Sequence, residues 1–229
     1  MQEKKVFAKG VGFQKLFVFF IIGCVFGTYY EMILNLIRHY IHYKDIFWET
    51  RQGVIYGPFS PVYGLGAVII TWVLAEKNHK WWQTLIYGAL LGGVVEYVAS
   101  LLQEWFTGTS SWNYSAMSLH INGRTTIPIM LVWGIFCVFF IKILYPFISK
   151  LVEKLPYKQA TIVLNICVIL LSLDMFISFS AVIRQSLRRD NIPAYTFYGE
   201  FLDKYYTDER LSKAYRNMWV VKKKWLTSL

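Results

Sequence analysis

Charged side chains are scarce in this chain, and so are the short signatures that many enzymes carry. Only 17% of the 229 residues are Asp, Glu, Lys or Arg, whereas 55% are hydrophobic. No Gly-x-x-x-x-Gly-Lys-Ser/Thr phosphate loop is present, which excludes ATP hydrolysis by that route. The sequence also lacks the Gly-x-Ser-x-Gly nucleophile elbow and the His-Glu-x-x-His zinc helix. Several familiar enzyme classes are therefore excluded.

Cysteine is rare as well. The three cysteines, Cys24, Cys137 and Cys167, fall inside apolar runs, and none belongs to a Cys-x-x-Cys pair. A free cysteine in that setting behaves as a small hydrophobic residue, so we expect no disulfide framework and no zinc site. His39 and His42 have the spacing of a metal-binding pair, but no further ligand is evident. We expect neither a metal nor a cofactor.

Long apolar segments are what the chain does contain. A helix needs about 20 mostly apolar residues to cross a bilayer. Five segments meet this requirement: 16–37, 54–76, 84–106, 126–148 and 160–183. The first is too long for a cleavable signal peptide and lacks a small-x-small cleavage site.

We therefore predict an all-α, polytopic integral membrane protein with about five transmembrane helices and a C-terminal amphipathic helix. Its expected parts are a basic leader over 1–15, a transmembrane helical domain over 16–184, and a basic amphipathic tail over 185–229. Within the tail, apolar spacing predicts a helix over about 195–221, with Phe201, Leu202, Tyr205, Tyr215 and Trp219 on its buried side.

The net charge of +10 favours a membrane over nucleic acid as the partner. Lys and Arg flank the apolar segments, where they meet anionic lipid headgroups, and no nucleic-acid motif is present. The orientation in the membrane stays open, because the flanking charges are nearly balanced. In either orientation, five spans place the loops at 38–53 and 107–125 on the same side.

Proline and glycine interrupt the start of the second apolar segment. The run Tyr56-Gly57-Pro58-Phe59-Ser60-Pro61 removes backbone donors and permits unusual dihedral angles. We expect a bent or re-entrant segment here, with regular helix from about Tyr63 or Gly64.

Two polar clusters stand against this apolar background. One runs from Arg51 to Gly64, and the other from Trp112 to Arg124, with Glu96 and Glu104 in the apolar segment between them. Lipid provides no water for a carboxylate, so these groups should face protein or a wet cavity. Because both loops lie on one side, the clusters can form one substrate site. The expected site residues are Arg51, Tyr56, Glu96, Glu104, Trp112, Tyr114, Asn122 and Arg124, with Glu31 and Tyr63 as additional candidates.

The two carboxylates lie about 12 Å apart along a helix, so Glu96 and Glu104 each need a separate partner. Arg51 and Arg124 are the natural candidates, because arginine pairs with carboxylates through two hydrogen bonds. Two interpretations stay open. The residues either lock the helices together as a structural ion-pair network or line a cavity for a substrate headgroup or a coupling ion.

Other residues have equally open roles. Trp112 and the tyrosines either stack on a ligand or form an aromatic belt at the membrane interface. Asp174 and Lys142, in other spans, are expected to be structural, with Lys142 paired to Asp174 or extended to the interface.

The combined motifs resemble a known family. They are Arg51-x-Gly-x-x-Tyr56-Gly-Pro-x-x-Pro-x-Tyr63-Gly, Glu96-Tyr-x-x-Ser-x-x-x-Glu104, Trp112-Asn-Tyr-Ser-x6-Asn122-Gly-Arg124 and Trp133-Gly134. Over about residues 15–148 the chain resembles the bacterial ABC-transporter permease family (type IV, CmpB-like). Asn113 departs from the Asp expected after the tryptophan. The resemblance implies a multi-pass subunit in the bacterial plasma membrane that works with a separate ATPase subunit.

The predicted function is therefore that of a permease-like membrane protein that binds or translocates a small or amphiphilic substrate. One alternative is a membrane-embedded enzyme acting on a lipid headgroup, with Glu96 or Glu104 as general base. Another is an accessory or scaffold subunit that transports nothing. Five spans are few for a complete transport path, which favours a homo-oligomer.

Overall fold

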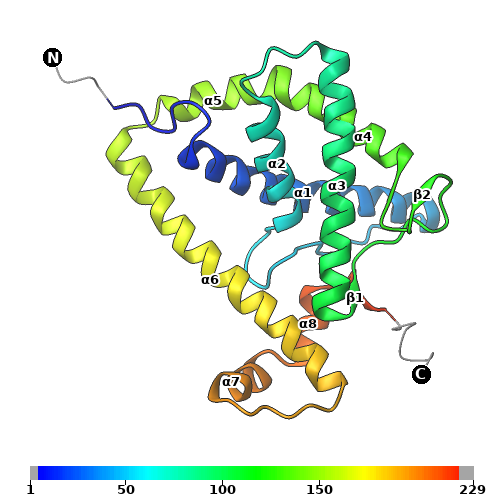
Figure 1. The fold of residues 1–229 in the computed structure, drawn as a ribbon. Helices are drawn as coiled ribbons and strands as arrows, with labels where there is room; N and C mark the ends of the chain where they lie inside the picture. The colour runs from blue at the N-terminus through cyan, green and yellow to red at the C-terminus, as the bar shows by residue number, and fades with distance from the viewer. Residues whose placement is uncertain (1–4, 222–229) are drawn as a thin grey trace.

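The computed structural model describes residues 5–221 and is helical throughout its apolar regions (Figure 1). Within this described range, four helices are long and apolar enough to cross a membrane. They are α1 (Phe13–Tyr43), α3 (Trp81–Thr107), the continuous helix Ile127–Glu153, and α6 (Tyr157–Arg189). The prediction of an all-α polytopic membrane protein is confirmed.

The remaining elements are short. They are α2 (Pro61–Leu74), α7 (Phe197–Tyr205), α8 (Asp208–Ala214), and the strands β1 (Thr109–Ser110), β2 (His120–Ile121), β3 (Thr125–Thr126) and β4 (Trp219–Val220). Strand β1 pairs with β4, and β2 pairs with β3, both antiparallel.

The apolar segment at 54–76 differs from the other four. Its helix, α2, has 14 residues, about 21 Å of helix against a hydrocarbon layer of about 30 Å. Proline is well suited to the first turn of a helix, so α2 begins at Pro61. The N–H of Ser60 donates to the carbonyl of Cys24 (3.1 Å), in the middle of α1. The bent segment expected before this helix is therefore present, and regular helix begins at Pro61, two residues before Tyr63. Because α2 is long enough for only part of the apolar layer, we call it a half-span.

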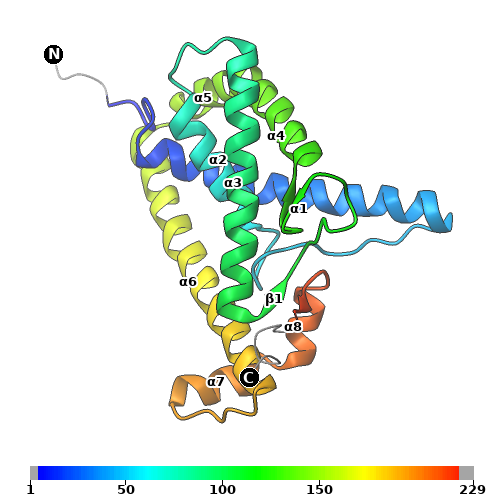
Figure 2. The same ribbon diagram turned by 45° about the vertical axis from the view of Figure 1, so that its right-hand side comes forward.

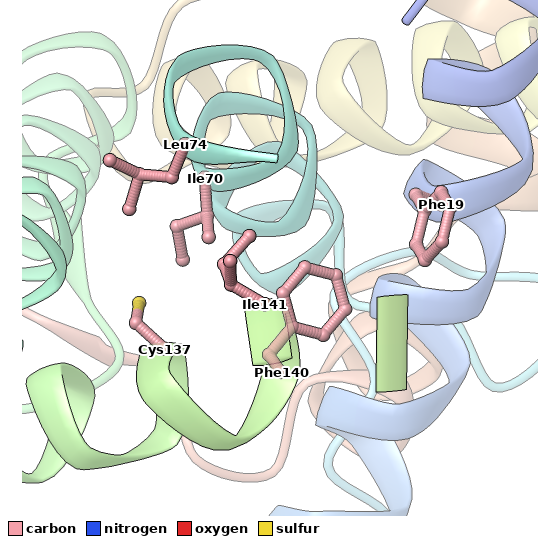
Figure 3. Close-up of a cluster of buried hydrophobic side chains, with 6 residues drawn as sticks. All are labelled: Phe19, Ile70, Leu74, Cys137, Phe140 and Ile141. Carbon is pink, nitrogen blue, oxygen red and sulfur yellow. The ribbon is translucent and has the colours of Figure 1, made fainter. Parts of the chain in front are cut away.

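Close approach of α1 and α2 fixes this half-span. A Cβ atom on Gly64 would overlap the Cys24 sulfur and lie 2.8 Å from the Phe20 ring. Gly23 and Gly27, which have the small-xxx-small spacing of a close-packing face, meet α2 in the same way. The second half of α2 and the middle of the helix Ile127–Glu153 share a core cluster with α1 (Figure 3). Its buried members are Phe19, Ile70, Leu74, Cys137, Phe140 and Ile141.

The helix from Ile127 to Glu153 carries a defect with an identifiable cause. Its parts are α4 (Ile127–Phe139), the π-helical turn η1 (Phe140–Leu144) and α5 (Tyr145–Glu153). Pro146 lies at the start of α5, has no N–H, and would clash with the carbonyl of Lys142 in a regular α-helix. The π turn widens the backbone immediately before this proline.

The spans do not form a parallel bundle. Helix α1 runs across α3 rather than alongside it in both ribbon views (Figures 1 and 2). Helix α3 packs chiefly on α4, and α1 packs chiefly on α2. Helix α6 runs along one side of the molecule from α5 to the tail helices (Figure 1).

A buried ion pair connects the start of α1 to the end of α5. Lys15, assigned from the sequence to the basic leader, lies in α1 with a fully buried side chain. Its ammonium group pairs with Glu153 (2.6 Å) and donates a hydrogen bond to Ser149. This lysine therefore anchors two helices rather than facing lipid headgroups.

The tail was expected to be one helix over about 195–221, but the structure contains two short helices and a strand there. Thr207 begins the second helix, and its side chain accepts a hydrogen bond from the N–H of Arg210. Leu202 and Tyr215 are buried as expected, whereas Tyr205 and Trp219 are exposed. The tail packs on the domain instead of extending as a single interfacial helix.

Arginines at the end of α6 hold the tail in place. Arg184 binds Asp203 through two hydrogen bonds of 2.8 Å, and Arg188 pairs with both Asp203 and Asp208. The hydrogen bonds from Arg184 hold the pKa of Asp203 below its usual range, so this carboxylate stays charged. Arg189 donates to the carbonyl of Thr107 at the end of α3 (2.8 Å).

Candidate functional site

Glu96 lies on the buried face of α3, only 8% exposed. Its carboxylate accepts hydrogen bonds from the Tyr114 hydroxyl (3.1 Å) and the Thr125 hydroxyl (2.9 Å). The indole of Trp133, on α4, also approaches this carboxylate. All three partners are neutral, which differs from the arginine expected from the sequence.

A second carboxylate, Glu31 of α1, lies close enough to Glu96 for their charges to interact. The phenol of Tyr63 lies beside Glu31, and Tyr63 occupies the first turn of α2. Aromatic rings line the same region, since Tyr63 is 5.7 Å from Trp133 and 6.4 Å from Tyr30, centroid to centroid.

We call Glu31, Tyr63, Glu96 and Tyr114 the acidic site. Helices α1, α2 and α3 and the loop after α3 each contribute one of these residues. Burial and the charge of Glu96 raise the pKa of the Tyr114 phenol. Tyr114 therefore stays protonated at neutral pH, and its hydroxyl donates a hydrogen bond to Glu96.

Neither carboxylate of the acidic site has an ion-pair partner within residues 5–221. Arg51, the expected partner, instead pairs with Glu49 (2.6 Å) and donates to Asn35 (2.9 Å). It still acts on Glu31 electrostatically. Asn35 lies one helical turn beyond Glu31 on α1, so Arg51 lies at the edge of the acidic site rather than inside it.

The other expected pair is present. Arg124 forms an ion pair with Glu104 (2.5 Å) and donates to the Ser100 hydroxyl (3.0 Å). Asn122 and Gly123 have positive φ angles, which confirms the tight turn, and it connects β2 to β3. A Cβ atom on Gly123 would lie 2.7 Å from the Asn113 side-chain oxygen. The turn directs the Arg124 guanidinium onto α3.

The remaining polar residues of the second cluster also dock the loop. The indole of Trp112 donates to the carbonyl of Arg124 (3.0 Å), and Asn122 donates to the Tyr97 hydroxyl (2.9 Å). Gln103 donates to Ser111 (2.9 Å). These contacts fold residues 109–126 against α3, and they position Tyr114 and Thr125 at Glu96.

Tyr56 lies elsewhere, under the C-terminal tail. Its hydroxyl is 2.9 Å from that of Tyr206 and accepts a hydrogen bond from Arg210 (3.2 Å). Burial and the neighbouring Tyr56 raise the pKa of Tyr206 to about 12. The backbone N–H of Tyr56 donates to Asp174 (3.2 Å). The first polar cluster is therefore divided between the acidic site and the tail.

Asp174 and Lys142 do not pair with each other. Asp174 accepts from Tyr56 and from the Ser178 hydroxyl (3.1 Å), which fixes the segment before α2 against α6. Lys142 reaches the carbonyl of His79 (2.5 Å), an exposed contact in the turn between α2 and α3. Each side chain joins two parts of the chain, which is consistent with the structural roles expected of both.

Sequence reasoning missed two members of the region around Glu96. Thr125 directly follows Arg124, so its place in the second cluster was visible, but a threonine at a helix start carries little chemical signal. Trp133 was noted only as part of a family motif. An apolar groove of about 300 Å³ also lies on the outer side of Thr125, with Leu90, Gly93, Tyr97 and Met130 among its lining residues.

A sequence model of the family described as "Putative ABC-transporter type IV" matches residues 18–179. The match includes all of the acidic site and ends within α6, before α7 and α8. Comparison with curated proteins and with solved structures found no match.

Proposed function

Because the chain belongs to this type IV ABC-transporter family, we propose that it is a membrane-embedded transporter subunit. Its acidic site binds the cationic group of a small or amphiphilic substrate. The observation that carries this proposal is the pair of carboxylates, Glu31 and Glu96, neither of which forms an ion pair within residues 5–221. Arg38 and Arg51 influence Glu31 without forming an ion pair with it. The sequence has no phosphate loop, so a separate ATPase subunit supplies the energy.

The energetics favour a cationic ligand. A carboxylate within a membrane span is costly unless it has both an opposite charge beside it and hydrogen bonds. Glu96 has hydrogen bonds from Tyr114 and Thr125, which orient it but leave its charge uncompensated. A bound cation would compensate both carboxylates at once, and the faces of Tyr63 and Trp133 attract cations through their quadrupoles.

The apolar groove beside Thr125 provides a place for the apolar part of an amphiphilic substrate. Thr125 lines the groove and also donates to Glu96. The apolar part of a substrate would lie in the groove while its charged group reached the carboxylates. Helix α2 begins beside this site as a half-span, a geometry that transporters use for binding sites at membrane depth.

Transport by the intact complex tests the proposal. Affinity purification from mild detergent should recover an ATP-hydrolysing subunit. Inside-out vesicles containing that complex should take up a fluorescent organic cation such as ethidium when ATP is added. Glu96→Gln preserves the shape and removes the charge, so uptake per folded protein should fall at least tenfold.

Glu104→Gln is the matched control, because it makes the same change two turns along the same helix. It should leave uptake per folded protein near the wild-type level. Purification without any ATP-hydrolysing partner would refute the subunit role. Equal uptake by the wild type and Glu96→Gln would refute the acidic site.

A further inference from the structure

Helix α6 presents two different faces. Its buried residues all point toward the rest of the chain: Leu164, Leu171, Asp174, Ser178, Ala181, Val182 and Arg184. The opposite side carries an exposed stripe with alternating spacings of three and four residues. It comprises Ile162, Asn165, Ile169, Ser172, Phe176 and Phe179. Spacings of three and four repeat every seven residues, the pattern of a helix–helix seam. We call these residues the outer stripe.

Asn165 is a polar residue on a helix surface that would otherwise face lipid. It lies eight residues after the start of α6, which is about 12 Å along the helix and well inside the apolar layer. In the first half of α6, Thr161 makes side-chain hydrogen bonds, whereas the amide of Asn165 makes none to any described residue. Hydrocarbon can neither donate to nor accept from its amide. A lipid-covered outer stripe would leave this group unsatisfied.

We propose that a second copy of this chain packs on the outer stripe, with the two α6 helices side by side. A side-chain amide is self-complementary in charge, because its NH₂ group carries partial positive charge and its oxygen partial negative charge. In a two-fold dimer the same residues meet across the axis, so each Asn165 would donate to the other. Ser172, seven residues later, repeats the polar contact.

Contacts within the chain show which part of the outer stripe is free for the second copy. Phe176 stacks on Tyr198 of α7, and Phe179 packs edge-on against Phe106 of α3. Those rings belong partly to the chain's own packing. Toward the start of α6, Ile162 and Ile169 are each 60% exposed. The seam therefore runs through the first half of α6, centred between Asn165 and Ser172.

Cysteine cross-linking in native membranes tests this seam. Cys167 would be replaced by alanine, whereas Cys24 and Cys137 are fully buried and can remain. Single cysteines at Ile162, Ile169 and Ser172 probe the outer stripe and leave Asn165 in place. Cysteines at Val163 and Leu170 are matched controls, since these residues are 58% and 62% exposed on another side of the helix. All five replace exposed residues, so folding should be preserved.

Mild oxidation should give a disulfide-linked dimer of this chain at the three outer-stripe positions, several-fold more than at the two control positions. Asn165→Leu should reduce association of the intact protein, measured by energy transfer between labelled copies in bilayers, and Asn165→Gln should retain it. Equal cross-linking at stripe and control positions, or none at all, would overturn the proposal. So would a cross-linked product containing a different protein.

Discussion

At the scale of single residues, two glutamates on one helix have different environments. Glu104 neutralises Arg124 at the exposed end of α3 and holds the loop in place. Glu96 is more deeply buried and has only neutral partners. Sequence spacing identified both as unusual but could not distinguish them. The difference depends on which loop residue folds back onto each, and only the three-dimensional fold determines that.

Glu104→Gln should therefore change stability slightly and function not at all. The Glu104 side chain is 36% exposed, so its ion pair is screened by solvent. We expect the free energy of unfolding to fall by less than about 1 kcal/mol. A detergent melting assay would show a small decrease in the midpoint. A loss of substrate handling by fully folded Glu104→Gln protein would instead place Glu104 inside the functional site.

Local sequence also could not locate Tyr56, which the sequence analysis predicts to lie in the substrate site. Its sequence neighbours suggested a place beside Arg51, but its hydroxyl contacts Tyr206 and Arg210. Those partners follow it by 150 and 154 residues. No local pattern encodes a contact over that separation. The Arg124–Glu104 pair was predictable, because a positive charge in a loop after a span tends to meet a carboxylate near the end of that span.

At the scale of elements, proline and cap residues determine where helices begin. Pro58 and Pro61 predicted the irregular start of α2, and the helix begins at Pro61. In the tail, apolar spacing suggested one helix over about 195–221. Thr207 followed by Asp208 and Glu209 is a helix-start signal, with a cap and acidic residues in the first turn. That signal would have indicated the break between α7 and α8.

The close packing of α2 on α1 gives a direct test with two similar substitutions. In Gly64→Ala the new methyl group would overlap the Cys24 sulfur, so we expect a loss of about 1–3 kcal/mol in unfolding free energy. Gly66→Ala, two residues along the same helix, meets nothing within 4 Å. It should leave stability unchanged or raise it by up to about 1 kcal/mol. Thermal unfolding in detergent compares them, and equal midpoints would contradict the proposed packing.

At the scale of the whole molecule, the region matched by the family model and the C-terminal tail are different parts of the chain. The match to the ABC-transporter family ends at residue 179, within α6. The tail then folds back on the end of α6 through Asp203 and on the segment before α2 through Tyr206. Its strand β4 pairs with β1, directly after α3. Composition identified a membrane protein from the apolar segments alone. It could not predict that α1 would cross α3, because crossing depends on contacts between distant residues.

Binding of a simple cation to the purified protein tests the central claim most directly. Equilibrium dialysis with radiolabelled tetraphenylphosphonium would compare the wild type with Glu31→Gln, Glu96→Gln and the control Glu104→Gln. The acidic site predicts saturable binding at one site per chain. It predicts that affinity falls at least tenfold in each of the first two variants and stays unchanged in the control. Absent binding, or binding that survives both Glu31→Gln and Glu96→Gln, would contradict it.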